Sequence, residues 1–474
     1  MQDPSIFVGE GLPVAFSSIS FLFYFLPLFF IIYYLIPARA KNVVLLAGSL
    51  FFYAWGEPRW ILLLLASILV TWLLGRAMRP EASAGRRRLL ILGLVFQLGL
   101  LVAVKYAGFF FGAFIDLPKL HLPLGVSFYT FHAISYLVDV YRQKTPPQKN
   151  LLRLGLYLAL FPKLVMGPIV PYHELEPALA QRTIDAQDVS DGCFRFTIGL
   201  AKKALLADAL AGLVTGIWGD LASLTVLSAW LGLIGYALQL YFDFSGYSDM
   251  AIGLGRMLGF RFPENFLYPY LCSSISDFWR RWHISLGSWF KEYLYFPLGG
   301  SRAGTLRTLR NLLLVWLATG LWHGASWNYV LWGLYFGVLI CLEKLLAPRF
   351  RAHPRKGLLA GLYRPVCLLL AVLGWVLFRA EDLPAAGRYF ACLFGGAAGV
   401  SAQARLYLHD FWPVLLLGAV GATPLCAKLA GRLGAKLQPG VRAAVQAVLV
   451  LALLACSTVW LLNGSFQSFV YFQF

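Results

Sequence analysis

The stretch from Asn311 to Leu342 reads NLLLVWLATGLWHGASWNYVLWGLYFGVLICL, and it decides the class of fold. Two apolar runs flank the small-residue sequence around His323, the only side chain in the stretch expected to titrate near neutral pH. Runs of this kind are typical of helices in a bilayer. A lone ionisable group at membrane depth is costly and usually functional. His323 is therefore the first candidate for chemistry.

The composition of the whole chain agrees with this interpretation. Of its 474 residues, 59% are hydrophobic and 13% are charged, whereas soluble domains average about 45–50% and ~25%. We expect an all-α integral membrane protein with about ten to twelve spans and a few short embedded helices. No polar stretch is long enough for a separate core, so the prediction is a single domain over residues 1–474. The apolar runs lie near residues 15–37, 43–55, 60–75, 89–104, 124–140, 152–170, 192–217, 225–242, 306–322, 327–342, 366–378, 412–430 and 442–463.

The net charge of +18 does not indicate nucleic acid binding, because Lys and Arg lie in short loops between apolar runs. Such loops are typical of the cytoplasmic side of a membrane. The loops after the first and third runs are basic, and the turn between the second and third is not. This pattern places the N-terminus outside the cytoplasm. Residues 1–13 are polar and lack a secretory cleavage signal, so they are a leader candidate and the first run is an anchor.

Seven dispersed cysteines, with no Cys-x-x-Cys pair, are typical of small buried hydrophobic residues. The chain has no Walker loop, no Gly-x-Gly-x-x-Gly after a strand and no His-Glu-x-x-His. We therefore expect neither a nucleotide site nor a metal site.

Small residues around His323, from Gly320 to Ser326, predict a helix end or kink that opens space beside the imidazole. An imidazole can take a proton from a hydroxyl near neutral pH, so a general base is the natural role. The alternative is a histidine held in a buried hydrogen bond. Its neighbours Trp322 and Asn328 are candidates for substrate or donor binding.

The segment 255–310 is rich in Arg, aromatic residues, Pro and Gly, and it predicts short re-entrant or interfacial helices. It carries His283, which could orient a substrate or stabilise a developing charge. Its flanking cations and indole are candidates for binding the phosphates of an acyl carrier. Interfacial snorkelling is the alternative for the cations. The binding candidates are Arg280, Arg281, Trp282 and Lys291.

Carboxylates and hydroxyls gather at the end of the apolar run 225–242 and in the segment that follows. Buried carboxylates need partners, and the arginine-rich segment offers them. We interpret the set as a structural polar network, with direct catalysis as the alternative. Its members are Asp243, Ser245, Asp249 and Asp277. Two more polar runs, 122–139 and 161–168, predict broken helices that line a cavity.

Taken together and in order, these runs resemble the membrane-bound O-acyltransferase family, and within it the bacterial branch of alginate O-acetylation membrane proteins. The runs that carry the resemblance are 16–18, 122–142, 167–169, 241–255, 277–300, 322–324, 378–380 and 471–474. The resemblance implies that His323 is the catalytic histidine and His283 a second catalytic histidine. It also implies a ring of tilted transmembrane helices around a central tunnel.

By the same resemblance, the chain takes an acetyl group from a cytosolic donor, acetyl-CoA, with no bound cofactor. It passes the group across the bacterial inner membrane for O-acetylation of an extracytoplasmic polysaccharide such as alginate. A separate periplasmic or surface acetyltransferase is the expected partner. In the implied mechanism His323 deprotonates an acceptor hydroxyl, and His283 or neighbouring donors stabilise the oxyanion.

Other functions stay open at the level of sequence. A D-alanyl or other acyl transferase to a cell-envelope polymer would share these runs. A polytopic transporter or flippase would use intramembrane His and Asp residues to relay protons or bind substrate. A scaffold for a polysaccharide-export complex would not need His323.

Overall fold

The computed structural model describes residues 15–78, 83–111, 123–302, 304–352 and 358–464. Within these ranges the chain is helical and contains no strand. Among these residues the contacts form two compact units, one within 15–200, 247–263 and 458–464, and the other within 201–246 and 264–457. The boundary at 246/247 falls inside the continuous helix α12 (Val226–Met257). Because this boundary lies within a helix, no linker-like sequence marks it. The sequence therefore predicted a single domain.

The first unit holds the N-terminal helices and the end of α12. Its elements are η2 (Phe21–Phe25), α1 (Leu26–Leu35), η3 (Ala38–Ala40), α2 (Lys41–Gly56), α3 (Ile61–Ala77), α4 (Ser83–Leu101), η4 (Val102–Tyr106), α5 (Ala107–Phe111), α6 (Val126–Tyr141), α7 (Leu151–Ala159), α8 (Phe161–Leu164), α9 (Tyr172–Ala180) and α10 (Ala186–Ala201).

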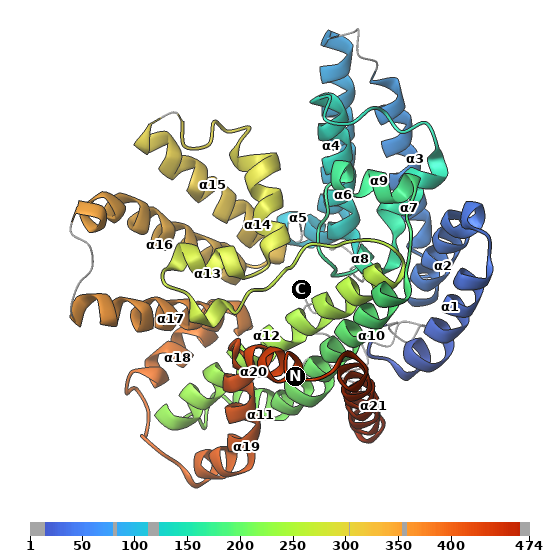
Figure 1. Cartoon of the computed structure of the whole chain (residues 1–474). Helices are drawn as coiled ribbons and strands as arrows, with labels where there is room; N and C mark the ends of the chain where they lie inside the picture. Colours follow the sequence, from blue (N-terminus) through green and yellow to red (C-terminus); the bar gives the residue numbers. More distant parts are fainter. Residues whose placement is uncertain (1–14, 79–82, 112–122, 303, 353–357, 465–474) are drawn as a thin grey trace. The chain divides into compact units, whose positions relative to one another are not determined.

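In this unit α3, α4 and α6 pack together, and α2 and α3 pack on α7, as the blue to green helices of Figure 1 show. The amide of Gln97 on α4 donates to the hydroxyls of Ser67 (3.0 Å) and Thr71 (2.8 Å) on α3. Interhelical hydrogen bonds of this kind satisfy polar groups that have no water around them.

Helix breaks occur where the polar runs predicted them. Gly125 precedes α6 with φ +77°, and a Cβ there would lie 2.7 Å from the carbonyl oxygen of Leu164. Only glycine adopts this conformation without strain. The chain breaks at Leu160, just before the second run, and α8 then ends inside that run at Leu164. Both runs therefore contain a helix boundary, whereas the cavity that they were predicted to line stays a prediction.

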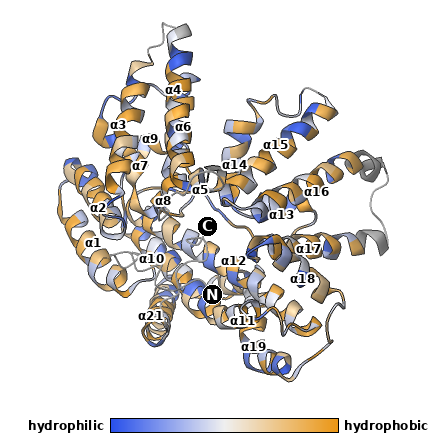
Figure 2. Ribbon diagram, turned by 180° about the vertical axis from the view of Figure 1, so that it is seen from behind, coloured by the Kyte–Doolittle hydropathy of each residue, from blue (hydrophilic) through white to orange (hydrophobic). Residues whose placement is uncertain are grey.

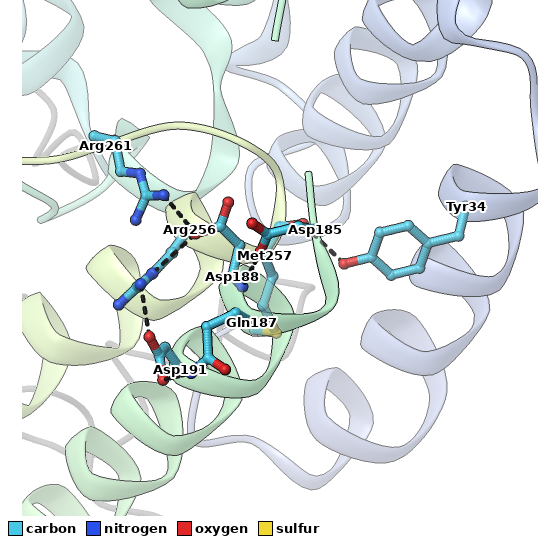
Figure 3. Close-up of polar contacts among 8 residues, drawn as sticks. All are labelled: Tyr34, Asp185, Gln187, Asp188, Asp191, Arg256, Met257 and Arg261. Carbon is cyan, nitrogen blue, oxygen red and sulfur yellow. Dashed lines mark hydrogen bonds and ion pairs between the residues drawn. The ribbon is translucent and has the colours of Figure 1, made fainter. Parts of the chain in front are cut away.

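An ion-pair cluster ties the start of α10 to the end of α12, and Figure 3 shows its members. The Asp185 carboxylate accepts from the backbone N–H of Asp188 at 2.7 Å, and so caps the first turn of α10. Asp188 accepts from Arg256 and Arg261, and Arg256 also contacts Asp191 at 2.6 Å. Carboxylates at a helix start and a guanidinium at a helix end both favour the helix dipoles.

The second unit holds the start of α12 and the helices that follow it. Its elements are η5 (Lys202–Ala207), α11 (Asp208–Trp218), η6 (Pro269–Leu271), α13 (Ile275–Arg281), α14 (Ile284–Phe290), η7 (Lys291–Tyr295), α15 (Thr305–His323), α16 (Trp327–Ala352), α17 (Leu358–Arg379), α18 (Leu383–Leu393), α19 (Ala402–Gly421), α20 (Leu425–Gly434) and most of α21 (Pro439–Asn463).

In this unit α15 and α16 form a tight hairpin, with α17 packed on α16 (Figure 1). The close approach depends on two facing glycines. A Cβ on Gly320 would overlap the carbonyl oxygen of Tyr329, and one on Gly333 would overlap that of Trp316. Small residues at such a crossing let helix backbones meet closely in lipid. The segment 255–310 does contain short helices, α13, α14 and η7; their place relative to the membrane stays a prediction.

Apolar surface is exposed along the long helices of both units, and Figure 2 shows hydrophobic colour over most of their length. Leu35 is 80% exposed in the first unit and Leu451 is 65% exposed in the second. Exposed apolar surface on this scale indicates contact with lipid. This exposed apolar surface agrees with the prediction of an all-α protein that lies in a bilayer.

Among the described residues, five helical segments are long and apolar enough to cross a membrane, and α19 with α20 forms a sixth candidate bent by 66°. The expected count of ten to twelve includes shorter helices, such as α2 and α6 with 16 residues each. The five segments are Gly85–Phe109, Val226–Met257, Trp327–Leu346, Leu362–Arg379 and Pro439–Asn463.

The cysteines only partly follow the expectation of burial. Three are buried, Cys272, Cys341 and Cys367, whereas three others are exposed. Composition alone does not say which face of an apolar helix meets another helix, so the prediction is wrong for the exposed residues Cys193, Cys426 and Cys456. The leader candidate 1–13 and the closing run 471–474 lie outside the described residues.

Candidate active site

His323 is the last residue of α15, and Gly324 follows it with an extended backbone (φ −172°, ψ 158°). The predicted helix end at this small-residue sequence is confirmed. The residue is 4% exposed. Its ring meets Trp332 of α16 at 4.8 Å and Phe378 of α17 at 5.1 Å between centroids, both edge-on. Three packed helices therefore hold the imidazole in an aromatic setting.

His283 lies between α13 and α14 and is 2% exposed. Its backbone is left-handed (φ 46°, ψ 55°), a conformation that costs free energy for a residue with a Cβ. Phe244 meets its ring edge-on at 4.6 Å between centroids. Burial lowers the pKa of His283, which lies outside the five long apolar segments, and so favours the neutral imidazole.

Trp322 lies close to both histidines. Its indole lies 4.8 Å from the His323 ring and 6.2 Å from the His283 ring, centroid to centroid. All three residues belong to the second unit. The structure thus brings together the two predicted catalytic residues, 40 positions apart in sequence, around one aromatic side chain.

Asn265 is a site residue that the sequence did not reveal. Its Oδ1 lies 3.1 Å from His283 Nδ1 and accepts from the backbone N–H (3.1 Å) and hydroxyl (3.0 Å) of Ser285. Its backbone carbonyl accepts from the N–H of Ile284 at 3.0 Å. The side chain is buried. No single helix or strand runs from Asn265 to His283, so no sequence period links the two residues and only the fold could reveal the pair.

The predicted donor-binding cations lie on the surface of the short-helix segment. Arg280 and Lys291 are exposed, and Lys291 Nζ lies 5.6 Å from the centroid of Phe296. Arg281 donates from Nε to Asp277 at 3.0 Å, one helical turn away. Trp282 is buried, with its ring 4.8 Å from that of Trp375.

Asn328 is buried and donates from Nδ2 to the carbonyl oxygen of Ala380 at 2.7 Å. This bond ties the start of α16 to the residue that follows α17. The Asn328 amide therefore helps to hold together α16 and α17, the two helices that contact His323.

The predicted polar network separates into distinct pairs. Lys203 Nζ lies 2.7 Å from carboxylate oxygens of both Asp243 and Asp208, and all three side chains are buried. Asp249, in the first unit, pairs with Arg195 of α10 at 2.5 Å. The arginine-rich segment was predicted to supply the partners, and it does so for Asp277. The partners of Asp243 and Asp249, Lys203 and Arg195, instead precede α12 in the sequence. Ser245 is buried, and its Oγ has no hydrogen bond to any described residue.

Metal ligation finds no support in the described part of the chain, where no group of three or more His, Cys, Asp or Glu residues could hold an ion.

Comparison with known proteins supplies the family. Residues 140–371, which include both histidines, match the model of the membrane-bound O-acyltransferase family. The chain is 44% identical to the "Probable alginate O-acetylase AlgI" of Azotobacter vinelandii over 80% of this chain and 78% of that protein. It is 43% identical to the protein of the same description from Pseudomonas aeruginosa, over 80% and 75%. The peptidoglycan O-acetyltransferase of Helicobacter pylori is 36% identical, over 78% of each chain.

These similarities extend over most of both chains, and the structure agrees with them in being helical and rich in exposed apolar surface. The chain therefore belongs to the membrane-bound O-acyltransferase family and is a multi-pass membrane acyltransferase.

Proposed function

We propose that this enzyme transfers acetyl groups from a cytosolic thioester, acetyl-CoA, for O-acetylation of an extracytoplasmic polysaccharide such as alginate. The observation that carries the proposal is the pair of buried histidines around Trp322. Three relatives of similar length support it, since their descriptions name an alginate O-acetylase or a peptidoglycan O-acetyltransferase.

His323 is the general base in this proposal. It takes the proton of an acceptor hydroxyl while the hydroxyl oxygen attacks the thioester carbonyl carbon and forms the new C–O bond. The C–S bond then breaks, and the proton held on His323 passes to the leaving sulfur, which departs as a thiol. General base catalysis of this kind contributes about 10²–10⁴-fold to the rate.

The aromatic setting favours this reaction over hydrolysis. Trp332 and Phe378 both meet the His323 ring edge-on, and both are nearly fully buried. Excluding water from a site strengthens its electrostatic interactions and prevents loss of a reactive acyl group.

The enzyme acts, in this proposal, in the bacterial inner membrane with its N-terminus outside the cytoplasm. Basic loops after the first and third apolar runs support that orientation. A periplasmic or surface acetyltransferase completes the transfer to the polymer. The exposed cations Arg280 and Lys291 serve the phosphates of the donor.

The test is the O-acetyl content of surface polysaccharide in a deletion strain complemented with wild type or His323→Ala. A matched control is His409→Ala, since that side chain is 84% exposed on α19. Membrane expression of all three proteins is equalised first. We expect wild type and His409→Ala to restore acetylation and His323→Ala to lose it. Full acetylation with His323→Ala would refute the proposed base.

A further inference from the structure

The orientation of the Asn265 side chain follows from its contacts. The backbone N–H of Ser285 can only donate, and it points at Asn265 from 3.1 Å. The atom that receives it must be the amide oxygen, because the amide nitrogen would place two donors against each other. The Ser285 hydroxyl, at 3.0 Å from the same atom, agrees with this orientation.

The same oxygen determines the tautomer of His283. Nδ1 lies 3.1 Å from Oδ1 of Asn265, and an amide oxygen carries no proton, so Nδ1 must be the donor. A neutral imidazole has one N–H, and the hydrogen bond at one nitrogen selects the form of the other. Nε2 of His283 therefore carries a lone pair. It is buried and has no hydrogen bond to any residue that the structure describes.

Two unfavourable features thus coincide at His283, a left-handed backbone and a buried acceptor with no protein donor. Strained backbones and unsatisfied buried polar groups cluster at functional sites. The Asn265 carbonyl and side chain, bonded to Ile284 and Ser285, hold the start of α14 and so hold the strained conformation.

We propose that Asn265 is a positioning residue that fixes the tautomer of His283, and that His283 Nε2 accepts a hydrogen bond from an N–H or O–H of a substrate. The identity of that substrate rests on the proposed function. Stabilising an oxyanion requires a donor, which the neutral ring does not offer at Nε2. Oxyanion stabilisation was expected from His283 or neighbouring donors, and in this proposal the neighbouring donors supply it.

The first test measures the tautomer directly and needs no substrate. Full-length protein with ¹⁵N-labelled histidine is placed in lipid bilayers, and the His283 signals are assigned by their loss in His283→Gln. Solid-state NMR should show a protonated Nδ1 and an unprotonated Nε2. In Asn265→Leu the second tautomer should appear. A wild-type His283 protonated at Nε2 would overturn the proposal, whatever the enzyme acylates.

The second test measures acetylation, with two substitutions at one position. Asn265→Leu removes the acceptor and should lower acetylation at least about tenfold at equal expression. Asn265→Asp keeps an oxygen for the same donors and should restore acetylation relative to Asn265→Leu. Its carboxylate would raise the pKa of His283, because a nearby negative charge favours the imidazolium. The acidic limb of the pH profile should then move to higher pH.

Binding of CoA distinguishes the two molecules that could donate the hydrogen bond to His283 Nε2, which are the acyl donor and the acceptor. Weaker CoA binding in Asn265→Leu would assign the hydrogen bond to an amide N–H of the donor. Unchanged CoA binding with reduced acetylation would assign it to the acceptor hydroxyl. Wild-type acetylation with Asn265→Leu, or equal loss and no shift of the pH profile with Asn265→Asp, would overturn the proposal. Absence of acetyl transfer by wild type would instead refute the proposed function and leave the NMR result valid.

Discussion

The indole of Trp332 stands edge-on to the imidazole of His323, with ring centroids 4.8 Å apart and an angle of 85° between the rings. Trp332 is fully buried and also contacts Phe378 and Phe336. Edge-to-face aromatic pairs contribute about 0.5–1.5 kcal/mol beyond the burial of their surface. The orientation of His323 is thus built into the packing of α15 against α16.

Replacement of this indole should affect both stability and activity. Trp332→Ala is expected to cost about 3–5 kcal/mol, because it removes a large buried side chain and leaves space beside His323. The measurement is the fraction of monodisperse protein left after heating in detergent, together with acetylation in cells. Trp412→Ala is the control, since Trp412 is 54% exposed. Equal thermal curves for the two variants would contradict the assigned packing.

A methyl group at Gly333 should separate the α15–α16 hairpin. Its Cβ would overlap the carbonyl oxygen of Trp316 and lie 3.0 Å from the Cα of Gly320. Overpacking of this kind costs about 1–3 kcal/mol, and the shift would also displace His323. We expect Gly333→Ala to lower both the melting temperature and the acetylation level.

Gly387→Ala, on α18, is the matched control for this change. No atom lies within 4 Å of the Cβ that it would add. Alanine is favoured over glycine inside a helix by roughly 0.5–1 kcal/mol, so this variant should be neutral or slightly stabilising. A Gly333→Ala protein as stable as Gly387→Ala would show that the helices are not held by this contact.

The sequence could predict features that depend on neighbours along the chain. The end of α15 at His323 follows from its small residues, and the breaks at Gly125 and Leu160 follow from polar and proline-containing runs. The helical class follows from apolar runs. Each of these depends on local chemistry that is visible within a few residues.

Features that depend on packing between helices could not be predicted. Asn265 meets His283 across an irregular segment, and Lys203 meets Asp243 from 40 positions away. Periodicity shows which face of a helix is apolar, but it does not show which other helix will cover that face. For the same reason the sequence predicted arginine partners for Asp243, whereas the observed lysine lies in η5, before α12.

Removal of the Lys203 ammonium should be strongly destabilising. Lys203→Met leaves the buried carboxylates of Asp208 and Asp243 without the cation that lies 2.7 Å from each of them. Breaking a buried ion pair from one side costs about 3–5 kcal/mol. Combining Lys203→Met with Asp208→Asn and Asp243→Asn should recover part of that loss. Expression and thermal stability report the effect, and a stable single mutant would contradict it.

The Asp188 cluster of Figure 3 offers a comparison between a buried carboxylate and an exposed one. The Asp188 side chain is 10% exposed and accepts from both Arg256 and Arg261, whereas Asp191 is 29% exposed and contacts Arg256. Asp188→Ala should cost roughly 1–3 kcal/mol, since it removes charged hydrogen bonds from a buried site. Asp191→Ala should cost about 0–1 kcal/mol.

Salt separates the two effects further. Ions screen exposed pairs more than buried ones. Raising the ionic strength should therefore reduce the small difference between wild type and Asp191→Ala, while the larger difference for Asp188→Ala persists. Thermal melts at low and high salt provide the measurement. If the Asp188→Ala difference vanished at high salt, the cluster would act as a solvent-exposed ion pair and not as a buried tie between α10 and α12.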